Sequence, residues 1–73
     1  MKIKDLEFKK ITVCCGQHEH AIFEKDNLKI EIYKNKRENG PDNYDIYLKY
    51  DNGNQNRKFM LLADELQTVL SEL

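Results

Sequence analysis

The chain has 73 residues, of which 34% are charged and 40% hydrophobic, and a formal net charge of −1 at pH 7. This length predicts a single domain, residues 1–73, and the near-zero charge lacks the basic balance typical of nucleic-acid-binding proteins. No run approaches the ~18 apolar residues of a membrane span, and the charged start lacks the apolar stretch of a signal peptide. We therefore expect a cytoplasmic domain that does not enter a membrane.

The first third of the chain predicts two short strands. Apolar residues alternate through residues 6–15, with a shift of one position at Lys9-Lys10 that a β-bulge or a break in the strand would explain. The polar stretch 16–20 is typical of a turn, and residues 21–24 form a second short apolar run. Lys25-Asp26-Asn27 then predicts another turn.

The centre of the chain gives the clearest strand patterns. Apolar and polar residues alternate strictly through 28–34 and again through 44–50, around a loop that contains Gly40-Pro41. In the second run Tyr44 and Tyr50 fall on the apolar side. Asn52-Gly53 is a strong hairpin signal, and it leads to a strand over 57–62 whose apolar end, 58–62, we expect to be buried.

The last residues predict an amphipathic helix. Asp64 followed by Gln67 resembles a capping box. The apolar stripe of this helix consists of Leu62, Leu66, Val69, Leu70 and Leu73. The predicted fold is therefore α+β: an antiparallel sheet of four to five strands followed by one C-terminal amphipathic helix packed on one face. A core this small often needs a partner subunit, and the stripe is wide, so we also expect a homodimer.

Two cysteines and two histidines lie close together near the end of the first strand: Cys14, Cys15, His18 and His20. Zinc binds thiolate and imidazole groups, but this spacing does not match the usual paired Cys and His ligand motifs. A Cys–His nucleophilic pair would lack a third, orienting group nearby in the sequence. The sequence therefore predicts no metal, no cofactor and no enzymatic activity.

The polar side of the two central strands is the best candidate binding surface. Aromatic rings on a strand can stack unpaired bases, and neighbouring cations can neutralise phosphates. The candidate residues are Lys29, Tyr33, Lys34, Lys36, Arg37, Tyr47 and Lys49. An ordinary solvated sheet face is the competing interpretation, since tyrosine favours strands and Glu31 and Asp45 share the surface.

Several short segments between Leu28 and Leu73 also resemble one known family. The segments are the strand 28–33, the loop with Gly40-Pro41, Tyr44-Asp45-Ile46, the run 58–62 and the helix start 63–66. They resemble the bacterial branch of the positive-cofactor-four family of single-stranded-DNA-binding, transcription-coactivator-like proteins. The resemblance implies a curved antiparallel sheet, dimerisation through C-terminal helices, and single strands bound across the sheets.

We therefore predict a non-enzymatic protein that binds single-stranded DNA or RNA across its sheet face, with the role in transcription that the resemblance implies. The alternative is a small inhibitor or adaptor module, of the type found in phages and mobile elements, that docks on another protein. Salt dependence separates the two, because phosphate binding weakens steeply as salt rises.

Overall fold

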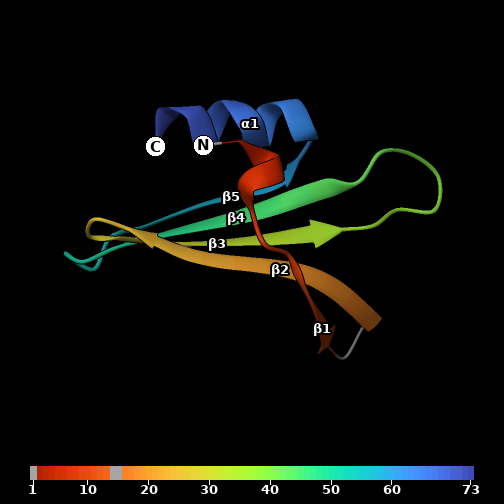
Figure 1. Ribbon diagram of the computed structural model, residues 1–73, viewed down its shortest axis with the longest axis horizontal. Coiled ribbons are helices and arrows are strands. Elements are labelled where there is room, and N and C mark those ends of the chain that lie inside the picture. Colours follow the sequence, from red (N-terminus) through yellow and green to blue (C-terminus); the bar gives the residue numbers. More distant parts are fainter. Residues whose placement is uncertain (1, 14–15) are drawn as a thin grey trace.

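The computed structural model describes residues 2–13 and 16–73, and an antiparallel sheet with a helix on one face dominates it (Figure 1). Within those ranges the elements are the 3-10 helix η1 (Ile3–Asp5), the strands β1 (Lys9–Val13), β2 (Gly16–Lys25), β3 (Leu28–Asn35), β4 (Asn43–Tyr50) and β5 (Gln55–Leu61), and the helix α1 (Ala63–Glu72). The five strands follow one another in the order β1-β2-β3-β4-β5, each antiparallel to its neighbours. The predicted α+β fold is confirmed.

Tight turns connect β2 to β3 and β4 to β5, as the sequence predicts. Lys25 pairs with Leu28, so the β2–β3 hairpin turns through Asp26 and Asn27, and Asp26 has a φ of 54°. Aspartate tolerates this left-handed conformation better than most residues. Gly53, with a φ of 89°, serves the same purpose between β4 and β5.

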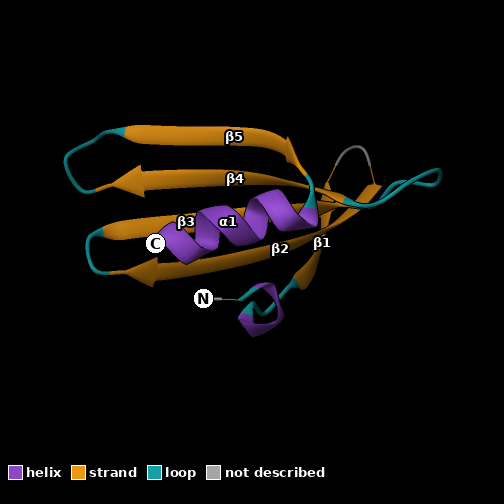
Figure 2. Ribbon diagram, turned by 90° about the horizontal axis from the view of Figure 1, so that it is seen from above, coloured by secondary structure: helices purple, strands orange, loops and turns teal. Residues whose placement is uncertain are grey.

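The core lies between α1 and the face of the sheet that the helix covers (Figures 1 and 2). In Figure 2 the helix lies across the middle of the sheet, with η1 to one side of it. Alternate residues of β3 and β4 point toward α1 and are joined there by its apolar stripe. The buried cluster consists of Ile30, Ile32, Tyr44, Ile46, Leu48, Leu66, Val69 and Leu70.

The helix begins at Ala63, one residue after the start of the predicted stripe. Leu62 is the N-cap residue and is 42% exposed, so it stands outside the core. The capping interaction also differs from the predicted one, because Glu65 Oε1 accepts a hydrogen bond from the backbone N–H of Leu62 at 3.1 Å. Asp64 instead accepts from the N–H of Glu65. Leu73 is half-buried against the core, as expected of the end of the stripe.

The run 58–62 is not a buried strand. Residues 55–60 of β5 are all exposed, because β5 lies at the edge of the sheet, beyond the area that α1 covers best. Met60 has a φ of 58°, and the β4–β5 register shifts between Tyr44 and Ile46. Tyr50, predicted on the apolar face, is likewise 40% exposed, since it stands at the open end of β4.

The N-terminal predictions also need correction. β1 begins at Lys9 and pairs regularly with β2 from Lys9 to Val13, so the shift at Lys9-Lys10 marks a break at the start of the strand and not a bulge. The predicted turn 16–20 is the first half of β2. Polar side chains are tolerated there because this end of the sheet projects past α1 (Figure 1). Cys14 and Cys15 lie outside the described residues.

Upstream of β1 the chain crosses to the helix side of the sheet. Ile3, Leu6 and Phe8 pack against the core, and the backbone N–H of Ile3 donates to Gln67 Oε1 at 3.0 Å. Across residues 2–13 and 16–73, no helix is long and apolar enough to cross a membrane.

Candidate functional site

The sheet face turned away from α1, called the open face here, carries side chains from every strand. Strict alternation along β3 buries Ile30 and Ile32 under the helix and therefore turns Lys29, Glu31 and Tyr33 to the other side. Antiparallel pairing then fixes their neighbours. Across the strands the open-face rows are His20–Tyr33–Asp45, Ile22–Glu31–Tyr47–Arg57 and Glu24–Lys29–Lys49–Gln55.

Four aromatic side chains form a continuous row across the open face, here called the aromatic row: His20, Tyr33, Tyr47 and Phe59. The His20 and Tyr33 rings stack with centroids 4.2 Å apart and planes at 9°. Tyr33 meets Tyr47 edge-on at 5.5 Å, and Tyr47 meets Phe59 edge-on at 5.7 Å. The row thus links β2, β3, β4 and β5, and each contact of this kind adds ~0.5–1.5 kcal/mol beyond area burial.

Phe59 reaches the row because β5 is irregular beside Asp45. The backbone N–H of Met60 donates to Asp45 Oδ1 at 2.9 Å instead of to the regular ladder. Lys58, on one side of this irregularity, is paired with Ile46, while Leu61, on the other, is paired with Tyr44. The bulged geometry leaves Phe59 against Tyr47, with 54% of its surface exposed.

Two lysines flank the aromatic row and share one carboxylate. Lys49 Nζ lies 3.4 Å and Lys29 Nζ 3.7 Å from Glu31 Oε1. Glu31 is only 13% exposed, whereas the two lysine side chains are 45% and 44% exposed. The exposed ammonium groups can contact an incoming anion, but this contact competes with their pairing to a largely buried carboxylate.

Tyr33 lies in the middle of this row, and one face of its ring is covered by His20. Burial raises its pKa, and the negative charge of Glu31 and the neighbouring Tyr47 raise it further. The phenol therefore stays neutral at physiological pH and can donate a hydrogen bond.

A shallow pocket of about 230 Å³ opens on the same face beside the two tyrosine rings. Its walls are Ile11, His18, Tyr33, Asn35, Asp45 and Tyr47. It thus combines a flat aromatic wall with amide, imidazole and carboxylate groups, a combination that suits a planar ring carrying hydrogen-bonding edges.

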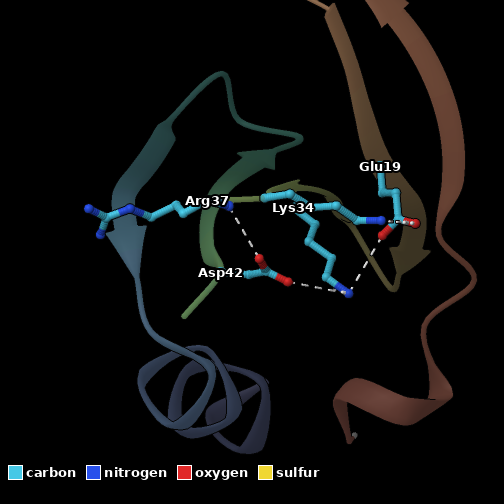
Figure 3. Close-up of polar contacts among 5 residues, drawn as sticks. Glu19, Lys34, Arg37 and Asp42 are labelled. Carbon is cyan, nitrogen blue, oxygen red and sulfur yellow. Dashed lines mark hydrogen bonds and ion pairs between the residues drawn. The ribbon is translucent and has the colours of Figure 1, made fainter. Parts of the chain in front are cut away.

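The remaining predicted cations lie elsewhere. Lys34 is paired with Tyr44 on the helix side, where its Nζ lies 3.6 Å from Glu19 and 4.0 Å from Asp42. Lys36 Nζ lies 3.7 Å from Glu19. Figure 3 shows this cluster, with the Arg37 side chain turned away from it while its backbone N–H reaches Asp42. The structure therefore brings Lys29, Tyr33, Tyr47 and Lys49 together on the open face, and leaves Lys34, Lys36 and Arg37 outside that group.

Two members of the aromatic row were not among the sequence candidates. His20 was assigned to a turn, and Phe59 to a buried strand. The alternation of His18, His20, Ile22 and Glu24 could have revealed the first. Phe59 depends on the β5 bulge, for which the sequence carries no clear signal.

His18 and His20 both lie on the open face. Among the described residues no three His, Cys, Asp or Glu side chains gather closely enough to hold a metal. The candidate cluster of Cys14, Cys15, His18 and His20 includes two residues beyond that description. His20 Nε2 is buried without a hydrogen-bond partner in the described part of the chain.

No family model, curated protein or solved structure matches this chain.

Proposed function

We propose that the protein binds single-stranded nucleic acid across its open face and performs no catalysis. The observation that supports this most strongly is the aromatic row, which crosses four strands beside exposed lysines. Unpaired bases stack on such rings whatever their sequence, while lysines at the side contact phosphates. DNA and RNA share this chemistry, and the role in transcription implied by the family resemblance is part of the same proposal.

The charges on the face predict moderate affinity. Lys29 and Lys49 already share Glu31, and Asp45 adds a second carboxylate near the rings. Few phosphates are therefore neutralised, so most of the binding free energy must come from stacking. We expect a shallower salt dependence than for a protein with a continuous basic groove.

The pocket beside the rings gives the proposal a base preference. Asp45 is an acceptor, and carboxylates accept from the exocyclic amino group of cytosine. Thymine has no such group. Oligo-dC should therefore bind more tightly than oligo-dT of equal length, and Asp45→Asn should reduce the difference.

The direct test is titration of labelled oligo-dT against the wild type and matched variants at two salt concentrations. Stacking is worth ~1–3 kcal/mol per base, so Tyr47→Ala should weaken binding roughly five- to hundredfold. Tyr47→Phe keeps the ring and should bind nearly as well as wild type. Lys49→Ala should weaken binding mainly at low salt. Absence of binding at low salt, or binding indifferent to Tyr47, would contradict the proposal.

A protein partner is the second candidate ligand of the open face, favoured by its exposed apolar groups. Ile22 is 53% and Phe59 54% exposed. Tyr47→Ala should also weaken the binding of an apolar protein partner. That binding, however, should not weaken as the salt concentration rises. Salt dependence therefore distinguishes the two.

Homodimerisation remains a prediction. Within one chain α1 already buries Leu66, Val69 and Leu70 against its own sheet. Its outward positions are polar: Asp64, Glu65, Thr68, Ser71 and Glu72. A dimer formed by apolar contacts between helices would therefore need a rearrangement of this packing, and sedimentation at high concentration tests for it.

A further inference from the structure

The outer edge of β2 is only half covered. β1 pairs with the first half of β2, and the register ends where Lys9 meets His20. The second half, Ala21–Lys25, pairs with β3 on its inner side. Among the described residues no strand pairs with its outer side. Figure 2 shows β1 beside just one end of β2. Backbone groups that point outward from this segment are therefore free to pair with another chain.

The chain cannot extend β1 to fill this position. Upstream of Lys9 it turns toward α1, where Leu6 and Phe8 pack against the core and Ile3 is hydrogen-bonded to Gln67. That crossing opens a cleft of about 560 Å³ between the residues before β1 and the uncovered half of β2. We call this space the β2 cleft.

The β2 cleft has an apolar lining and an acidic rim. Leu6, Ile22 and Phe23 contribute apolar surface, and Ile22 is 53% exposed. Three carboxylates line the same space: Asp5, Glu7 and Glu24. Lys9 and His20 stand at its closed end, where β1 begins. Lys25, at the far end of the strand, is engaged with the main-chain oxygen of Leu73.

We infer that the β2 cleft binds an extended peptide segment of another protein, in which apolar and basic residues alternate. The segment adds to the sheet as a strand beside Ala21–Lys25, in line with β1. Its backbone pairs with the free backbone of β2. Its apolar side chains lie on the helix side of the sheet beside Phe23, and its basic side chains lie on the open side, which carries Glu24. Five residues at ~3.3 Å each give a strand of about 17 Å, which sets the length of the segment.

Charge argues against a second copy of this chain as the occupant. Two copies paired through the same edge would bring together two clefts that are each lined by Asp5, Glu7 and Glu24. The negative charge of one cleft would repel that of the other. A basic segment turns the same rim into an attraction.

The opposite edge of the sheet is less suited to strand addition. β5 carries a bulge next to Met60, whose backbone N–H is already bonded to Asp45. Arg57 and Lys58 add charge to this edge. Bulges and charged residues are the features that block edge-to-edge pairing, and the uncovered half of β2 shows a regular register with β3.

The probe for this inference is a labelled six-residue peptide of alternating lysine and valine with blocked ends, titrated by fluorescence anisotropy. We expect saturable binding, and no binding of the matched peptide of alternating glutamate and valine. Two further peptides carry methyl groups on the backbone nitrogens of either the odd or the even residues. One of them should bind more than about tenfold more weakly than the unmethylated peptide, and the other nearly as well. Strand addition alone requires this difference, since only alternate N–H groups face β2.

Variants connect the binding to the cleft. The exposed double variant Glu7→Gln/Glu24→Gln should bind roughly two- to thirtyfold more weakly at low salt. Tyr47→Ala should bind the peptide as the wild type does, so failure of this inference is distinguishable from failure of the nucleic-acid proposal. Equal binding of both peptides, indifference to backbone methylation, or a concentration-dependent oligomer that excludes the peptide would each overturn the inference.

Discussion

The two faces of the sheet are built from the same strands but differ in what their side chains do. On the helix side Ile30, Ile32 and Ile46 have no exposed surface, and Leu66 and Leu70 seal them from above. On the open side their immediate neighbours in sequence form the aromatic row and its lysines. Adjacent residues such as Ile46 and Tyr47 therefore belong to different environments.

This difference has an energetic consequence. Removing a fully buried aliphatic side chain costs the transfer free energy and leaves a cavity, whereas trimming a side chain on the open face leaves solvent. The helix side should therefore determine whether the protein folds, and the open side what it binds. Substitutions on each face in turn test this separation.

The largest expected effect comes from truncating the helix stripe. Leu66→Ala and Leu70→Ala should each lower the free energy of unfolding by about 2–5 kcal/mol, because both residues are completely buried. Leu62→Ala is the matched control on the same helix. It should cost much less, since Leu62 is exposed and its cap contact involves only the backbone. Urea titration measures all three, and equal midpoints would show that α1 does not seal the core.

A smaller effect is expected at the helix start. Glu65→Ala removes the acceptor of the Leu62 N–H and should lower the free energy of unfolding by about 1 kcal/mol. Asp64→Ala is the comparison, because Asp64 accepts only from the N–H of its neighbour Glu65. Thermal or urea unfolding that ranks Asp64→Ala as the more damaging variant would contradict the assigned cap.

Tyr33 on the open face should make a pH-dependent contribution to stability. The pKa of Tyr33 is raised by burial and by Glu31, so the neutral phenol is favoured in the folded state. The resulting stabilisation is fully present below the unfolded-state pKa of about 10 and is lost as pH rises through the folded-state pKa. Tyr33→Phe should therefore lose less stability than wild type between pH 8 and pH 11. Urea titrations at both values give the comparison, and parallel losses would contradict it.

The sequence determined the helix side of the molecule well and the open face only in part. Strict alternation in β3 and β4 predicted which side of each strand is buried, and the spacing of Leu66, Val69 and Leu70 predicted the helix that covers it. Tyr33 and Tyr47 were placed on a shared face by the same pattern. Alternation within a strand is a local property, which is why it succeeded there.

The remaining features depend on how strands pair. His20 stacks on Tyr33 because β2 extends back to Gly16, although that stretch has the polar composition of a turn. Phe59 joins Tyr47 through a bulge. Lys34 is different, because it shares the phase of Ile30 and Ile32 within β3, and alternation alone places it on the helix side. Register and bulges are set by the whole sheet, and no single segment shows them.

Chemical-shift mapping of a bound oligonucleotide shows whether the open face binds while the helix side stays unaffected. Oligo-dT is titrated into isotope-labelled protein at low salt, and backbone amide shifts are followed by NMR. We expect the largest changes at Tyr33, Tyr47 and Phe59, with the outer side of α1 at Thr68 and Glu72 unchanged. Changes centred on α1, or none at any oligonucleotide concentration, would contradict the assignment of the open face as the binding surface.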